Sequence, residues 1–109
     1  MKLEDRVMRD GVCYIHSLRH TDANLSLKFL ADPSGSTIAR VLTFSRVQAY
    51  QEEWYERDDD CIEMLIGLHE EVKKDGVDYM LHTDQRELWF HSDADPSVED
   101  VVPDAAADQ

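Results

Sequence analysis

Basic residues are scarce in this sequence: 11 Lys and Arg stand against 24 Asp and Glu, which gives a net charge of −13 over 109 residues. A nucleic-acid-binding protein neutralises phosphates with clustered Lys and Arg, so we expect no nucleic-acid partner. The same excess of acid opposes attraction to anionic membrane surfaces, and we expect no membrane partner either. A basic protein partner or a metal cation is electrostatically permitted, although strong charge also serves solubility alone.

Cysteines and long apolar runs are also few. Cys13 and Cys61 are isolated and form no Cys-x-x-Cys pair, so the fold does not require a disulfide framework. The longest apolar stretch, in the segment CIEMLIGL, is too short to cross a bilayer. The N-terminal segment MKLEDRVMRDG mixes acids with bases and has no apolar run behind it, unlike a secretory signal. We therefore expect a cytoplasmic protein.

The length and the hydrophobic content of 42% suit one small domain with its own core. We predict a single acidic α+β domain over residues 1–92, with a charge of −7, followed by an acidic, largely disordered tail over residues 93–109. The tail has six acids, no base and two prolines. Its few large apolar groups offset little of the cost of chain ordering, so we expect disorder from about Val102 onward.

The first half of the chain has strand patterns. The segment at 12–20 mixes β-branched, aromatic and polar residues without Gly or Pro, and it predicts a first strand. Around the turn segment DPSGS at 32–36, apolar residues alternate with polar ones. The apolar set is Leu25, Leu27, Phe29, Ile38, Leu42 and Phe44. This pattern predicts a β-hairpin from Leu25 to Phe44 with a loop longer than two residues.

Residues 60–75 have the signals of a helix start and a helix end. Asp60 and Glu63 have the spacing of a capping box, and Gly76 follows two lysines at the position of a left-handed cap. One apolar stripe has helical spacing: Ile62, Leu65, Ile66, His69 and Val72. Gly67 costs about 1 kcal/mol relative to Ala inside a helix. A short buried strand over 62–68 is therefore an alternative to the predicted helix.

A second hairpin is predicted over residues 77–92, with a loop at Gln85-Arg86 that places His82 opposite Trp89. Alternation separates two faces: Tyr79, Leu81, Leu88 and Phe90 on one, and Met80, His82, Trp89 and His91 on the other. The predicted fold is therefore α+β. It has about five mainly antiparallel strands and one principal helix near 60–75, in the order three strands, helix, hairpin.

Known catalytic and metal-binding patterns are incomplete in this sequence. Two strand histidines, His82 and His91, supply at most half of the ligands that zinc needs. The segment DDDCIEM lacks the glycine of a calcium loop, and DPSGSTIAR lacks the ending of a phosphate loop. Cys13 and His16 would lie on opposite faces of a strand, which defeats a nucleophile–base pair. We predict no catalytic residues, no metal ligands and no cofactor.

The remaining signal is an aromatic and acidic surface. Trp54 and Tyr55 lie within the acidic segment QEEWYERDDD, and exposed aromatic residues rimmed by charge are typical of interaction surfaces. We expect a small non-enzymatic interaction or regulatory domain that binds a protein partner, preferably a basic one. The predicted contact residues are Trp54, Tyr55, Met80, His82, Trp89 and His91. In an alternative interpretation, the side chains of Trp54 and Tyr55 fold back over the edge of the core.

Two further expectations concern a second copy of the chain. The alternative function is a small-molecule or metal-dependent enzyme with a site formed between subunits from His82, His91 and the partner subunit's His16 or His20. In addition, an uncovered face with Met80, Trp89 and His91 predicts a homodimer, because a symmetric contact covers one patch on both copies. Charge repulsion opposes it, so we expect the dimer to be weak or concentration-dependent.

Overall fold

The structure is a computed structural model, and it describes residues 2–35, 37–55, 57 and 60–101. Within these residues, eight strands form one antiparallel sheet, and helical structure is limited to two short segments. The elements in chain order are α1 (Leu3–Val7), the 3-10 turn η1 (Arg9–Gly11), β1 (Tyr14–Thr21), β2 (Asn24–Leu30), β3 (Ile38–Phe44), β4 (Val47–Trp54), β5 (Glu63–Lys73), β6 (Gly76–Thr83), β7 (Arg86–Ser92) and β8 (Ser97–Asp100). The strand order is β4-β7-β6-β5-β1-β2-β3-β8.

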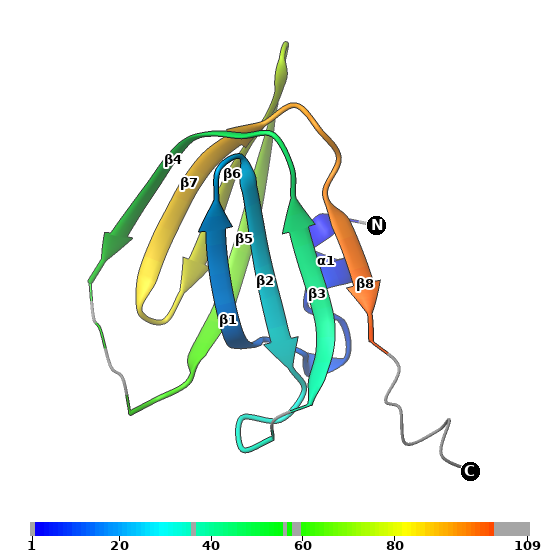
Figure 1. Cartoon of the computed structure of the whole chain (residues 1–109), viewed down its shortest axis with the longest axis vertical. Coiled ribbons are helices and arrows are strands. Elements are labelled where there is room, and N and C mark those ends of the chain that lie inside the picture. The colour runs from blue at the N-terminus through cyan, green and yellow to red at the C-terminus, as the bar shows by residue number, and fades with distance from the viewer. Residues whose placement is uncertain (1, 36, 56, 58–59, 102–109) are drawn as a thin grey trace.

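The sheet folds over on itself, so that its two halves face each other (Figure 1). Strands β1, β2, β3 and β8 form one layer, and β4, β7, β6 and β5 form the other. The layers join where β1 pairs with β5, through Tyr14 opposite Met64 and Ile15 opposite Glu63. The chain crosses between the layers again from β3 to β4 through residues 45–46.

The hydrophobic core lies between the two layers and is built from alternate strand positions. Leu25, Leu27 and Phe29 of β2 are fully buried, which fits the alternation of the sequence. Phe44 of β3 reaches across to the other layer, where its ring centroid lies 4.8 Å from that of Tyr79 and 4.7 Å from that of Phe90. Such aromatic contacts contribute about 0.5–1.5 kcal/mol each beyond burial. Phe44 therefore links the two layers.

Both predicted hairpins are present. In the first, β2 pairs with β3 and Leu25 lies opposite Phe44, which confirms the prediction. In the second, β6 and β7 have the predicted faces but another register, with Met80 opposite Trp89. The loop is residues 84–85, because Thr83 Oγ1 accepts hydrogen bonds from the N–H groups of residues 85 (3.1 Å) and 86 (3.0 Å) and closes the turn one residue earlier.

The principal helix predicted near 60–75 is wrong, and with it the α+β class of about five strands. The segment is β5, which pairs with β6 along most of its length, so the fold is mostly β. The apolar stripe does not share one face, since Leu65 is buried while Ile66 and Val72 are 52% and 80% exposed. A bulge between Leu65 and Gly67 interrupts the alternation of the strand and hides its period of two. The alternative prediction, a short buried strand over 62–68, was closer to the structure, but β5 is longer and is exposed beyond Leu68.

Both ends of the described chain meet at Arg40 of β3, which is 3% exposed. Its Nη1 donates to the carbonyls of Val7 (2.6 Å) and Arg9 (2.9 Å), and its Nε donates to Asp100 of β8 (2.7 Å). The hydrogen bond from Arg40 lowers the pKa of Asp100. Strand β8 belongs to the region predicted as a tail, so ordered structure continues past residue 92; residues 102–109 lie outside the described residues.

A polar network crosses the inner face of the second layer near the β6–β7 turn. Arg86 of β7 donates to both carboxylate oxygens of Glu63 in β5, at 2.8 and 2.9 Å. Thr83 Oγ1 of β6 donates to the same carboxylate at 2.6 Å. Arg86 Nη1 also lies 3.3 Å from Glu52 of β4, whose other oxygen accepts from the hydroxyl of Tyr50 at 2.8 Å. The guanidinium of Arg86 thus ties β7 to β5 and β4, and Thr83 joins β6 to the same network through Glu63.

The side chains of Arg86 and Glu63 are only 10% and 11% exposed, so their ion pair is largely removed from water. We expect Arg86→Met to lower the free energy of unfolding by about 3–5 kcal/mol, because it leaves a buried carboxylate without its partner. Chemical denaturation followed by circular dichroism measures this change. The control is Arg46→Met, which breaks a surface ion pair with Asp93 and should cost less than about 1 kcal/mol. Equal losses in the two variants would contradict the structural role of Arg86.

Candidate functional site

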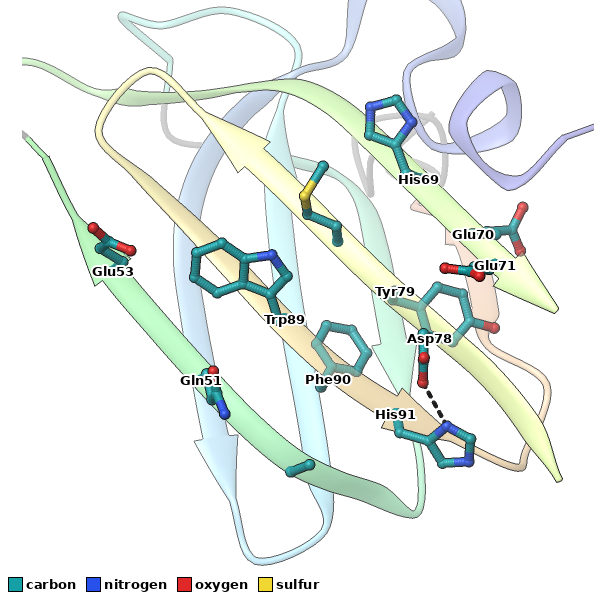
Figure 2. A pocket seen from close by; sticks show the side chains of 12 residues that line it. Gln51, Glu53, His69, Glu70, Glu71, Asp78, Tyr79, Trp89, Phe90 and His91 are labelled. Atoms are coloured by element: carbon teal, nitrogen blue, oxygen red, sulfur yellow. Dashed lines mark hydrogen bonds and ion pairs between the residues drawn. The ribbon is translucent and has the colours of Figure 1, made fainter. Parts of the chain in front are cut away.

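The outer face of the second layer carries a hollow of about 610 Å³, shown in Figure 2. Strand register aligns its side chains in rows that run across β5, β6, β7 and β4. In the middle row, His69 lies opposite Met80, Met80 opposite Trp89, and Trp89 opposite Gln51. Met80 and Trp89 are partly exposed and form an apolar centre.

Acidic side chains flank this apolar centre on both sides. In one neighbouring row Glu71 lies opposite Asp78, and in the other Glu53 lies opposite Glu87. Like charges directly opposite each other destabilise a strand pair, so the pairing of Glu53 with Glu87 is unfavourable for the fold. The described residues that line the hollow include four acids, Glu53, Glu70, Glu71 and Asp78, and no Lys or Arg.

One basic side chain reaches the rim of the hollow. Lys73 Nζ lies 2.8 Å from Glu71 and 4.0 Å from Asp78, and the hydrogen bond to Glu71 raises the pKa of Lys73. This lysine offsets part of the charge at the β5–β6 end. It stands against four acids in the lining, Glu53, Glu70, Glu71 and Asp78. The hollow therefore keeps an excess of negative charge.

His91 is fixed at the same end of the hollow. Its Nδ1 lies 2.7 Å from Asp78 Oδ1, the contact drawn in Figure 2, and its Nε2 lies 3.3 Å from the carbonyl of Asp75. The hydrogen bond to Asp78 raises the pKa of His91 above its ordinary value. The ring packs against Gly76, where an added Cβ would lie 2.7 Å from Nε2. A charged His91 is thus stabilised by Asp78, which lies opposite it on β6.

The structure divides the six predicted contact residues between two sides of the sheet. Met80, His82, Trp89 and His91 alternate with buried residues and share the outer face. Trp54 lies opposite Arg86 on the inner side, where its ring is covered by Arg86 at 4.2 Å and by Arg57 at 4.7 Å. Tyr55 is 51% exposed, and its hydroxyl donates to the carbonyl of Thr83 and lies 3.2 Å from His82 Nδ1.

Sequence reasoning missed the lining residues from β4 and β5. Gln51 and Glu53 were not assigned to a strand, and His69 and Glu71 were assigned to a helix. One local signal favoured the correct structure: the Asp75-Gly76 dipeptide lies at the turn from β5 to β6, where Gly76 is the first residue of β6, and Asp-Gly pairs are typical of tight hairpins. Treated as a turn, it would have placed His69 and Met80 on adjacent strands.

The histidines of the predicted catalytic alternative are dispersed. His16 is exposed at a bulge of β1, and His20 stacks on Tyr50 with ring centroids 4.1 Å apart. His82 lies 3.3 Å from Glu87, two rows away from His91. Within the described residues, no group of three or more His, Cys, Asp or Glu side chains is arranged to hold a metal ion. The catalytic alternative, a site formed between two subunits, stays a prediction.

Comparisons with known proteins bear on the fold. No family model matches the sequence, and no curated protein matches it. A crystal structure of an uncharacterized protein from Neisseria gonorrhoeae is similar, with a TM-score of 0.53 and 9% sequence identity. The similarity covers 83% of this chain and 92% of that one. At this identity the likeness concerns the fold alone. In the described residues, no helix is long and apolar enough to span a membrane.

The pairing of His91 with Asp78 predicts a shifted titration. We expect His91 to titrate above pH 6.5 in an NMR experiment, and Asp78→Asn to bring its pKa down toward the ordinary value. Because the folded pKa is the higher one, the stabilising contribution is complete below the unfolded pKa and is lost as pH rises through the folded pKa. Asp78→Asn should therefore lower the melting temperature more at pH 5.5 than at pH 9. Asp95→Asn is the control, and an unchanged His91 titration in Asp78→Asn would refute the pairing.

Gly76 provides a test of the same end of the hollow. Its φ is 148°, and an added Cβ would lie 2.7 Å from both His91 Nε2 and the Ser92 carbonyl. We expect Gly76→Ala to cost about 1–3 kcal/mol of unfolding free energy because it adds backbone strain and displaces the imidazole. Gly35→Ala is the control, since its added Cβ would meet nothing closer than 3.4 Å. Denaturation of both variants measures the difference, and similar losses would contradict it.

Proposed function

We propose that this protein is a small non-enzymatic interaction or regulatory domain whose outer face binds a basic segment of a protein partner. The observation that carries the proposal is the hollow with Met80 and Trp89 at its centre and four acids in its lining, with no Lys or Arg among the described lining residues.

This combination suits the side chain of lysine or arginine. The aliphatic part of such a side chain packs on apolar surface while its charged end stays near polar groups, so it matches an apolar centre with an acidic border. The indole ring of Trp89 adds a favourable face for a cation. A cation near Glu53 would also relieve its repulsion from Glu87, which lies directly opposite.

The overall charge of −13 favours the same class of partner. Complementary charge steers diffusional encounter and raises the rate of association with a basic surface. A second copy of the chain is a poorer occupant, because a symmetric contact would bring two acidic hollows together. The predicted weak homodimer through Met80, Trp89 and His91 is therefore a secondary proposal, and sedimentation at high protein concentration tests it.

Titration with a defined peptide tests basic-segment binding. The protein has two tryptophans, so in the Trp54→Phe variant all tryptophan fluorescence comes from Trp89. We expect a capped decapeptide of alternating lysine and threonine to change Trp89 fluorescence in a saturable way, with a dissociation constant below about 1 mM. Binding should weaken as salt is raised, because ions screen exposed charges. A matched decapeptide of glutamate and threonine should leave the fluorescence unchanged.

Paired variants locate the contact. Glu53→Gln should weaken binding of the lysine peptide by about two- to fivefold, the range of one exposed ion pair. Glu99→Gln makes the same chemical change on β8, in the other layer, and should leave the affinity unchanged. Equal binding of the acidic peptide, or equal effects of the two variants, would overturn the proposed function.

A further inference from the structure

β5 has an open edge beside the outer face. On one side it pairs with β6 from Leu65 to Lys73, but on the other side β1 pairs only with Glu63 and Met64. Within the described ranges, no strand continues the pairing of that side past the junction with β1. Figure 1 shows the β5–β6 hairpin extending beyond the neighbouring strands.

A side chain occupies the first backbone donor along this edge. The N–H of Leu68 donates to Glu4 Oε2 of α1 at 2.8 Å, in the position where a carbonyl of an adjacent strand would accept. Backbone groups of successive strand residues point to alternate sides, so Glu70 and Val72 direct their N–H and C=O groups to the same edge. A second hollow of about 370 Å³ borders the edge, lined by Lys2, Glu4, Leu68, His69, Glu70 and Val72.

We propose that the basic segment of the partner binds as an added antiparallel strand on the edge of β5 from Leu68 to Val72. This inference rests on the proposed function and gives its binding mode. Main-chain hydrogen bonds to an open sheet edge supply affinity, and alternate side chains supply specificity. An added strand would place alternate side chains beside His69 and Glu71. It would therefore extend the middle row of the outer face, which contains Met80 and Trp89, and the neighbouring row, which contains Asp78.

The charges along the edge select the occupant. A second copy paired antiparallel about Glu70 or Glu71 would place an acid directly opposite the same acid, which destabilises a strand pair. Charged side chains are a common protection of open edges against self-pairing. The same carboxylates attract a strand with lysine or arginine at the facing positions. The edge therefore favours a basic segment over a second copy of this chain.

Amide hydrogen exchange tests strand addition directly. In the free protein we expect the amides of Glu70 and Val72 to exchange rapidly, because they face the open edge. Saturation with the lysine–threonine decapeptide should slow both by about tenfold or more as they donate to the added strand. The amides of Glu71 and Lys73 face β6 and serve as internal controls, with slow exchange in both states. No protection of the amides of Glu70 and Val72 at saturation would overturn strand addition.

A proline variant provides the second test. Val72→Pro removes one N–H donor from the edge without removing a hydrogen bond to β6, and proline is tolerated at such edge positions. It should weaken peptide binding by about three- to tenfold, the range for one hydrogen bond. Val72→Ala keeps the N–H and is the matched control, and circular dichroism verifies the fold of both. Equal affinities of the two folded variants would count against the added strand.

The readouts separate the two proposals. If Trp89 fluorescence and the Glu53→Gln variant respond as expected but the amides of Glu70 and Val72 stay unprotected, the proposed function stands and strand addition is wrong. If these amides become protected while Glu53→Gln binds like Glu99→Gln, strand addition stands and the outer hollow is not the contact. If the peptide changes neither signal, both proposals are wrong.

Discussion

The ion pair between Glu63 and Arg86 is the interaction on which the second layer of the sheet depends. Glu63 occupies the junction of the two layers, since its backbone pairs with Ile15 of β1. Its carboxylate accepts from Arg86 and Thr83 on the inner face, and Arg86 extends the network to Glu52 of β4. The interaction therefore fixes the place where the sheet folds over and also attaches the outermost strand of this layer.

The inner side of the second layer uses most of the large aromatic side chains, and few of them remain exposed on the outer face. Trp54 covers the guanidinium of Arg86, and Phe44 and Phe90 fill the space between the layers. Burial and the hydrogen bond to Glu52 raise the pKa of Tyr50, which keeps its hydroxyl protonated beside that carboxylate. Trp89, by contrast, lies partly exposed on the outer face. The outer face thus combines an available aromatic ring with the four acids that line the hollow.

Local alternation predicted those parts of the fold that depend on neighbouring residues. The spacing of Leu25, Leu27 and Phe29 was sufficient for the first hairpin, and the faces of β6 and β7 followed from the same rule. The register of β6 and β7 was not predictable, because it depends on the hydroxyl of Thr83 closing the turn. For a similar reason Arg86 was expected in the hairpin loop, whereas it lies in β7 and a glutamate 23 positions away holds it inside.

The error at β5 had a physical cause as well. Asp60 and Glu63 have the spacing of a helix cap, but the carboxylate of Glu63 is satisfied by Arg86 instead. Competing local and tertiary partners cannot be ranked from spacing alone, since long-range pairing overrides weak local preference. The prediction of the candidate site was the most incomplete part, because half of the outer face comes from β4 and β5. The shared face of Met80, His82, Trp89 and His91 was predicted correctly because a single hairpin places them together.

Arg40 brings the two ends of the described chain to one point, since it binds the carbonyls of Val7 and Arg9 and the carboxylate of Asp100. Chain ends that lie close together are the geometric condition for circular permutation. A short linker could join the ends beside Arg40, and new ends could open in the loop between β2 and β3, with the three hydrogen bonds of the guanidinium preserved. Such a chain would begin with β3, pass through β4 to β8 without interruption, and finish with α1, β1 and β2. The order of the strands in the sequence is in this sense separable from their order in the sheet.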